Sequence, residues 1–310
     1  MLGALLAADR VAALVAAANR QSRPWLEFRR EDFAAGYNRH PFLVEHRLAD
    51  HPLFTFESLA ALCRRLPPNQ VHVRAGVVPA DAEFDTSLKR FNQGLSLEDA
   101  LDHLVERGAY IAVNNPEFDA VYGPAIEGFL GEIAAQTEPL EPGLNWFSTY
   151  LFISAQNAVT PYHMDREMNF LLQVRGTKTV RLWDPNDDEI MSPAQKDILL
   201  AARDQPRPTY KPSFDAKAMV FELRPGIGVH HPFIAPHLVT TNSSLSISLA
   251  ITFRTARSDL WTDAHIFNAR CRRLGLNPST VGKRAIVDDV KARAIRAIRT
   301  ARNVTRRAKA

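Results

Sequence analysis

The feature that most constrains this chain is the run from Thr160 to Asp165, taken together with a histidine far beyond it. His163 and Asp165 are two residues apart, and His237 follows Asp165 by 72 residues. In an extended strand alternate side chains point to the same face, so His163 and Asp165 can both reach one cavity. His237 then has to come from a second strand that the fold brings alongside. Two imidazoles and one carboxylate are the set that holds non-haem Fe(II) on one face, so we expect the chain to fold around such a centre.

A His-x-Asp pair alone is a weak signal, because a surface strand with two polar residues has the same spacing. The residues that follow strengthen it. Asn169 to Val174 is largely apolar, Gly176 comes next, and Lys178 to Trp183 precedes Asp184 and Pro185. This order predicts a strand, a tight turn at Gly176 and a second strand. We therefore expect a hairpin directly after the candidate ligands, as a small β-barrel requires.

Residues 160–178, T-P-Y-H-M-D-R-E-M-N-F-L-L-Q-V-R-G-T-K, resemble the JmjC/cupin-like (cupin-8 type) oxygenases that depend on Fe(II) and 2-oxoglutarate. Within that family they are most similar to the asparaginyl hydroxylases of hypoxia-inducible factor. Residues 232–239, P-F-I-A-P-H-L-V, match a later motif of the family, and the resemblance covers about residues 145–255. It implies a mostly β fold, a double-stranded β-helix (jelly-roll) barrel with flanking helices. A helical N-terminal elaboration and a C-terminal helix would complete it.

The resemblance also implies a role for each matched residue. It implies that Fe(II) is held by His163, Asp165 and His237. It implies that the distal carboxylate of 2-oxoglutarate, the cosubstrate, is received by Lys178. Thr160 and Asn169 would donate hydrogen bonds to the same molecule.

Elementary physics supports the role of Lys178. A buried dicarboxylate needs a cation and hydrogen-bond donors, because an unpaired buried charge is costly. Lys178 is the only lysine in the two predicted strands. The alternative is a solvated strand lysine, since lysine is seldom buried. Strand propensity alone is the alternative for Thr160, and the role of Asn169 is open in the same way.

The third metal ligand has to be chosen among His230, His231 and His237. In the family this ligand follows a proline by five residues and precedes the last long strand. Pro232 and His237 fit that rule, and residues 245–253 alternate serine with apolar residues as a strand does. We therefore prefer His237 to His231. His230 and His231 are expected to be structural or to orient a ligand.

Two positions depart from the family pattern. Where the asparaginyl hydroxylase has an asparagine, fifteen residues after its last ligand, this chain has Thr252. A tyrosine that contacts the cosubstrate in the family has only a weak counterpart here, in Tyr150 or Tyr110. Specificity for peptidyl asparagine is therefore not carried over to this chain.

The resemblance implies a dioxygenase that hydroxylates a substrate and releases succinate and CO2. Its prime substrate, a protein side chain or a small molecule, is not identified by the sequence. A cupin-like module that binds a metal or a small acid without catalysis, as a sensor or interaction protein, is the alternative, since one fold hosts many functions.

Composition favours a cytoplasmic protein with one main domain. Hydrophobic residues make up 46% of the 310 residues, enough for a large core, and the only cysteines, Cys63 and Cys271, do not form a disulfide framework. Leu2 to Ala18 is interrupted by charge and fits an amphipathic helix better than a signal peptide. The rest of the N-terminal part should mix helices (Ser58 to Leu66, Ser96 to about Arg107, Val121 to Gln136) with strands (Val71 to Arg74, Tyr110 to Val113).

The C-terminal segment is strongly basic. Residues 269–310 contain thirteen Lys/Arg and two Asp/Glu, whereas the whole chain has a net charge of +4. A helix is expected from Ala285 to about Arg302, with an apolar stripe of Val287, Val290, Ala294, Ile298 and Ala301. It could pack on its own chain or form a homodimer, which the resemblance favours slightly, or contact anionic lipid or nucleic acid. We expect three regions: residues 1–140 as a mixed α/β elaboration, 141–258 as the barrel, and 259–310 as the basic helical segment.

Overall fold

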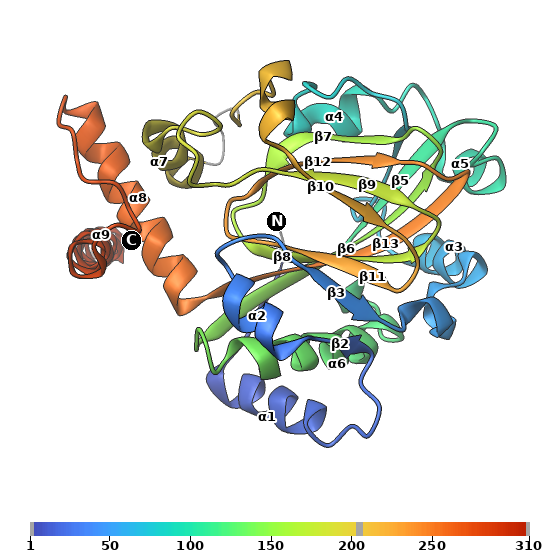
Figure 1. The fold of residues 1–310 in the computed structure, drawn as a ribbon, viewed down its shortest axis with the longest axis horizontal. Coiled ribbons are helices and arrows are strands. Elements are labelled where there is room, and N and C mark those ends of the chain that lie inside the picture. The colour runs from blue at the N-terminus through green and yellow to red at the C-terminus, as the bar shows by residue number, and fades with distance from the viewer. Residues whose placement is uncertain (1–2, 203–206, 308–310) are drawn as a thin grey trace.

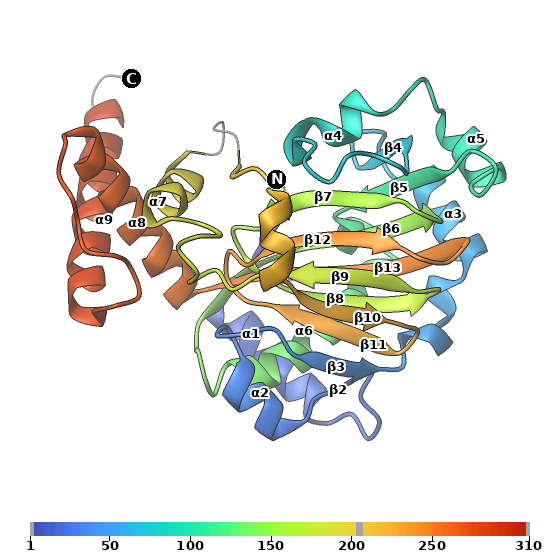
Figure 2. The same cartoon turned by 45° about the horizontal axis from the view of Figure 1, so that its top comes forward.

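The computed structural model describes residues 3–202 and 207–307, and its centre is a pair of antiparallel β-sheets (Figures 1 and 2). The larger sheet has the order β2 (Leu26–Glu27), β3 (Leu43–His46), β11 (Ile227–His231), β8 (Met168–Arg175), β13 (Leu245–Thr255), β6 (Leu144–Ala155), β5 (Ala109–Asn114) and β4 (Val71–Ala75), and β1 (Ala4–Leu5) also pairs with β6. The smaller sheet has the order β10 (Met219–Leu223), β9 (Lys178–Leu182), β12 (Pro236–Thr241) and β7 (Val159–Met164).

The chain passes repeatedly from one sheet to the other. From β6 to β9, and again from β10 to β13, each strand lies in the opposite sheet from the one before it. Apolar side chains of both sheets pack between them: Leu171, Val180, Leu182, Leu223, Val229, Ala235, Val239 and Ala250. This alternation around a shared core is the double-stranded β-helix of a cupin, so the predicted fold class is confirmed.

The predicted hairpin around Gly176 is wrong in its pairing, although both of its strands exist. β8 belongs to the larger sheet and β9 to the smaller one. Both edges of β8 are already paired, with β11 on one side and β13 on the other, so no edge is left for β9. Gly176 instead turns the chain between sheets at φ +69°, where an added Cβ would lie 2.1 Å from the Leu245 carbonyl oxygen.

Helices cover the outer face of the larger sheet. α1 (Ala8–Ala18), α2 (Arg30–Gly36) and α6 (Tyr122–Thr137) lie beneath it in Figure 1, and α3 (Phe56–Arg65) lies at the end of the barrel where α5 (Leu97–Asp102) also lies. α6 buries Ile126, Phe129, Leu130 and Ile133 against this face. Single-turn 3-10 helices occupy Leu48–Asp50, Pro52–Phe54 and Pro116–Phe118, and a longer one occupies Pro212–Lys217.

The N-terminal elements differ from expectation mainly at their ends. The first helix begins only at Ala8, because Ala4 and Leu5 pair with β6 instead, and Leu2 lies outside the described residues. Ser96 caps α5 as predicted, accepting a hydrogen bond from the Asp99 amide, but the helix ends at Asp102 and not near Arg107. The strand expected at Val71 and the helix expected at Val121 are present, as β4 and α6.

Three helices gather at one end of the barrel, on the side away from α3 and α5 (Figures 1 and 2). They are α7 (Pro193–Ala201), α8 (Ala256–Arg273) and α9 (Ala285–Arg307). The predicted stripe on α9 does not form its buried face: Val290 is 61% and Ile298 40% exposed. Its buried residues, among those whose burial is described, are instead Asp288, Lys291, Ala292 and Ile295. Arg296 and Arg299 also form ion pairs with Asp263 of α8.

The N-terminal strands are continuous with the barrel. β3 pairs with β11, and β5 pairs with β6, so the first 140 residues extend the same large sheet. The division at residues 140 and 258 stays a prediction. In the described ranges, no helix has both the length and the apolarity that crossing a bilayer demands.

Candidate metal centre

Strand pairing brings the three candidate ligands together. β7 and β12 are antiparallel neighbours, and His163 lies directly opposite His237. Asp165 follows the end of β7. Its Oδ1 atom lies 3.7 Å from Nε2 of His163, and its Oδ2 atom lies 3.9 Å from Nε2 of His237. One ligand atom from each of the three residues lies within 4.8 Å of the others, so one ion could contact all of them.

Backbone carbonyls orient both imidazoles. Nδ1 of His163 is 2.8 Å from the Pro161 oxygen, and Nδ1 of His237 is 3.0 Å from the Ala235 oxygen. A carbonyl can only accept, so Nδ1 carries the proton in each ring and Nε2 keeps its lone pair toward Asp165. Burial lowers the pKa of both histidines below the usual value. Two neutral imidazoles with free Nε2 atoms therefore face one carboxylate.

Phe84, on α4 (Phe84–Arg90), packs flat against His163. The ring centroids are 3.6 Å apart and the planes differ by 4°. Arg207 lies 5.0 Å from the centroid of Phe84 and pairs with Asp85 through two bonds of 2.9 Å. It also donates to the Met164 carbonyl. These residues close one side of the centre. They could not be predicted from the sequence, because their spacing from the motif carries no signal.

A cavity of about 300 Å³ opens from the centre into the space between the sheets. Every residue predicted for the site lines it: Tyr150, Thr160, His163, Asp165, Asn169, Lys178 and His237. These residues come from five strands, with Asp165 just beyond the end of β7. The structure thus brings the whole predicted set together, although their roles as ligands stay predictions.

Lys178 lies deep in this cavity. It is 3% exposed, and its ammonium donates a 2.7 Å hydrogen bond to Oγ of Ser248. Within residues 3–202 and 207–307, no carboxylate lies within ion-pair distance of it. Burial without such a partner lowers the pKa of Lys178 to about 7. The alternative of a solvated strand lysine does not hold.

The remaining predicted residues surround the same space. Thr160 Oγ1 is 3.2 Å from the hydroxyl of Tyr110, which also lines the cavity. The side-chain oxygen of Asn169 is buried without a hydrogen-bond partner in the described part of the chain. Tyr150 faces the cavity from β6, and burial raises the pKa of its hydroxyl. A buried polar atom without a partner, such as the Asn169 oxygen, is the kind that a ligand or a water molecule would satisfy.

The two other histidines of the cluster differ from His237. His230 accepts from the Asn38 amide at Nε2, and its Nδ1 donates to the Asn169 carbonyl, so it is held by backbone groups and supports Asn169. The His231 ring lies 4.5 Å from that of His237, and both of its nitrogens are buried without a partner among the described residues. Of the three, only His237 lies within 4 Å of Asp165.

Arg74 is a further lining residue that the sequence did not reveal. It is 1% exposed and donates to the carbonyl oxygens of Ala75 and Val159 at 2.7 and 2.6 Å. Its guanidinium lies 3.9 Å from the ring centroid of Tyr110. These contacts hold Tyr110 in place in the cavity wall.

Comparisons with known proteins place the chain in a family. A model described as a cupin-like domain matches residues 64–259, more than half of the chain. No curated protein matches the sequence. A structure of YcfD, a ribosomal oxygenase from Escherichia coli, in complex with cobalt and 2-oxoglutarate has 15% identity and a TM-score of 0.45, covering 89% of this chain and 67% of that one.

Two further solved structures are similar to this chain. Another E. coli YcfD structure has 14% identity and a TM-score of 0.44, covering 84% of this chain and 63% of its own. Procruciferin, an 11S globulin from Brassica napus, has 10% identity and a TM-score of 0.24 over 34% of this chain and 20% of its own. The chain thus spans about two thirds of the length of YcfD. By the extent of the family match, it belongs to the cupin-like domain family.

Proposed function

We propose that the chain is a non-haem dioxygenase that uses Fe(II) and 2-oxoglutarate to hydroxylate an as yet unidentified substrate. One observation carries the proposal: two carbonyl-oriented histidines, a carboxylate and an unpaired buried lysine all face a single cavity. A purely structural barrel has no need of this set. An uncompensated cation and a cluster of ligand atoms inside a core both reduce stability unless something binds them.

The donor set fits iron. Two imidazole nitrogens and one carboxylate oxygen on one face are typical of non-haem Fe(II) oxygenases, which keep the opposite face open. His163 and His237 would bind through Nε2, and Asp165 through its carboxylate. A structural zinc site would instead enclose its ion with four protein ligands, rich in cysteine. Neither cysteine of this chain lines the cavity.

The rest of the cavity fits a dicarboxylate. The ammonium of Lys178 would pair with the distal carboxylate, and the Ser248 hydroxyl is already placed beside it at 2.7 Å. Thr160 offers a hydroxyl on the same wall. The amide of Asn169 can turn to present its N–H group where its unpartnered oxygen now lies. Ser248, Thr160 and Asn169 would hold the cosubstrate between Lys178 and the iron ligands.

When bound, the iron and its cosubstrate would supply the oxidation: 2-oxoglutarate, dioxygen and a C–H bond give succinate, CO2 and an alcohol. The protein's part is positioning. Lys178 fixes one end of the cosubstrate, and the triad leaves the substrate side of the site open. Phe84 holds the plane of His163, and the aromatic rings of Tyr110 and Phe152 line the cavity wall.

Succinate release from 2-oxoglutarate, with anaerobically loaded Fe(II) and then air, tests the proposal. The wild type should release succinate, and His163→Ala should not. His103→Ala is the matched control, because His103 is an exposed histidine that does not line the cavity. Turnover that survives in His163→Ala would refute the proposal.

The alternative, a cupin-like module that binds metal or a small acid without catalysis, predicts bound iron and bound 2-oxoglutarate but no succinate. The prime substrate is a protein side chain or a small molecule. A search for products heavier by one oxygen atom, comparing peptides and metabolites of a deletion strain with those of its parent, would identify it.

We also propose that the chain forms a homodimer through its C-terminal helix. α9 packs on α8 of its own chain, and Ile286, Val290 and Ile298 are left exposed on it. A second copy would cover this face. Sedimentation of the wild type against Val290→Lys tests this, since an exposed lysine would disrupt a dimer but leave a monomer unchanged. Contact of the basic helix with lipid or nucleic acid is the less favoured prediction.

A further inference from the structure

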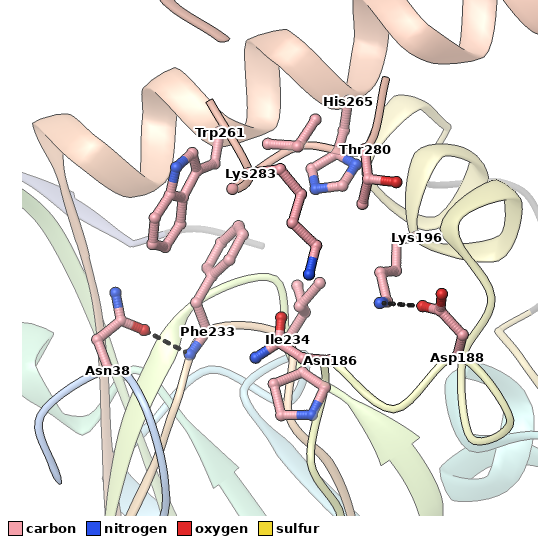
Figure 3. A pocket seen from close by; sticks show the side chains of 13 residues that line it. Asn38, Asn186, Asp188, Lys196, Phe233, Ile234, Trp261, His265, Thr280 and Lys283 are labelled. Atoms are coloured by element: carbon pink, nitrogen blue, oxygen red, sulfur yellow. Dashed lines mark hydrogen bonds and ion pairs between the residues drawn. The ribbon is translucent and has the colours of Figure 1, made fainter. Parts of the chain in front are cut away.

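A second cavity, of about 180 Å³, lies where the C-terminal helices meet the end of the barrel (Figure 3). Its walls come from distant parts of the chain: the turn between β11 and β12, the loop after β9, helices α7 and α8, and the loop between α8 and α9. Among the described residues, no lining residue is shared with the cavity of the metal centre. It is a separate compartment.

Two lysines and a hydroxyl reach this cavity. Figure 3 shows the Lys283 side chain extending into it, in the space between Phe233 and Lys196. Within the ranges 3–202 and 207–307, Lys283 has no ion-pair partner. Lys196 is 5% exposed and donates to Asp188 at 3.2 Å, and Thr280 adds a hydroxyl. The carboxylate of Asp188 is 63% exposed, and Lys196 is its one ion-pair partner in the described part of the chain, so one positive charge is left over.

A buried histidine is aimed at the same space. His265 is 5% exposed, and its Nδ1 lies 2.7 Å from Oδ1 of Asp197. The other oxygen of Asp197 accepts from Arg272 at 2.8 Å. Nδ1 is therefore the donor to Asp197, and Nε2 has no hydrogen-bond partner among the described residues. The carboxylate fixes the ring, and Nε2 keeps its lone pair, so it can accept a hydrogen bond from a donor group in the cavity.

The loop that carries Thr280 and Lys283 is held in place by hydrogen bonds to residues of α8 and α9. The Lys291 ammonium and the Asn268 amide both donate to the Ser279 carbonyl, at 2.6 and 3.1 Å. Asp288 accepts from the Gly282 amide at 2.8 Å. Lys291 and Asp288 belong to the buried face of α9. These bonds preform the cavity, so a ligand would not have to order the loop.

The remaining wall is aromatic, and the volume limits the ligand. Trp261 and Phe233 lie with centroids 5.8 Å apart and planes at 43°. The cavity has a volume of about 180 Å³. That space suits a single small ring with an acidic group. It is too small for the drug-sized ligands that fill pockets of roughly 300–1,000 Å³.

We propose that this cavity binds a small planar organic acid, whose carboxylate or phosphate meets Lys283 and Lys196 while its ring lies against Trp261 and Phe233. The proposal does not depend on the function of the metal centre, because the two cavities have no lining residue in common. Recognition follows from charge-assisted hydrogen bonds at one end and apolar contact at the other.

Titration calorimetry with benzoate, phenyl phosphate and neutral benzamide tests the proposal on the full chain. At least one of the two acids should bind saturably, and benzamide at least tenfold more weakly, since it lacks the charge. Lys283→Ala should weaken the acid roughly tenfold or more. Arg284→Ala is the matched control: it removes a positive charge one residue away, from a side chain that does not line the cavity. It should bind as the wild type does.

Two more variants locate the bound acid. Trp261→Phe should remove any change in tryptophan fluorescence on binding. Lys178→Met should leave binding unchanged, because Lys178 lines only the other cavity. The proposal is overturned if neither acid binds, if benzamide binds as well as benzoate, or if binding is lost in Lys178→Met and kept in Lys283→Ala. Lys283 is exposed, so its variant tests binding without disturbing the core.

Discussion

Above neutral pH, the affinity of the metal-site cavity for 2-oxoglutarate should fall about tenfold for each pH unit. The reason is Lys178, whose pKa is lowered to about 7 by burial. Only its protonated ammonium can pair with the distal carboxylate. At pH 8, protonating the side chain before pairing costs about 1.4 kcal/mol, and at pH 9 about 2.7 kcal/mol. These energies correspond to roughly tenfold and hundredfold weaker binding, until the pKa of the complex is reached.

Titration calorimetry of the Co(II)-loaded protein with 2-oxoglutarate, between about pH 6 and 9, measures this fall. Repeating it in buffers of different ionisation enthalpy counts protons: uptake should rise from near zero toward one per ligand. Lys178→Arg is the control, because a guanidinium stays charged throughout this range, so its affinity should vary little with pH. A flat wild-type profile, or an equal fall in Lys178→Arg, would refute the assigned role of Lys178.

Three further predictions concern stability and metal affinity. The pKa of Lys178 is lower in the folded chain than in the unfolded chain. The ligand-free wild type, measured by urea unfolding, should therefore gain stability relative to Lys178→Met as pH rises from about 7 toward 10.5. A loss of stability over this range would contradict the lowered pKa. Gly94→Ala should cost roughly 1–2 kcal/mol of unfolding free energy through backbone strain, because open space surrounds Gly94. Gly176→Ala should cost more, because the Leu245 carbonyl lies close to Gly176. Equal losses of unfolding free energy would contradict that close approach. Phe84→Ala should weaken Fe(II) binding about tenfold by freeing the His163 ring, and unchanged affinity would show that the stacking is incidental.

The candidate site was largely predictable because its signals are local. His163, Asp165 and Lys178 lie within sixteen residues of one another, and period-two strands place alternate side chains on one face. The proline spacing then singled out His237, which the structure places opposite His163. Strand positions also followed from the alternation of residue types, as β13 and β4 show.

The errors concern which elements pack together. The strands on either side of Gly176 were predicted, but not that β11 and β13 occupy both edges of β8. The buried face of α9 carries Ala292 and Ile295, and its ion pairs reach Asp263 on another helix. Phe84 and Arg207 reach the metal centre from regions far from the motif in sequence. Such tertiary pairings leave no periodic mark on a single sequence.

The central claim is that three side chains converge on one ferrous ion. Anaerobic calorimetric titration with Fe(II) should show that the wild type and His103→Ala each bind one equivalent of iron. Binding should be lost or greatly weakened in His163→Ala, Asp165→Ala and His237→Ala. A His237→Ala variant that still binds one equivalent as tightly as the wild type, while His231→Ala does not, would contradict the claim.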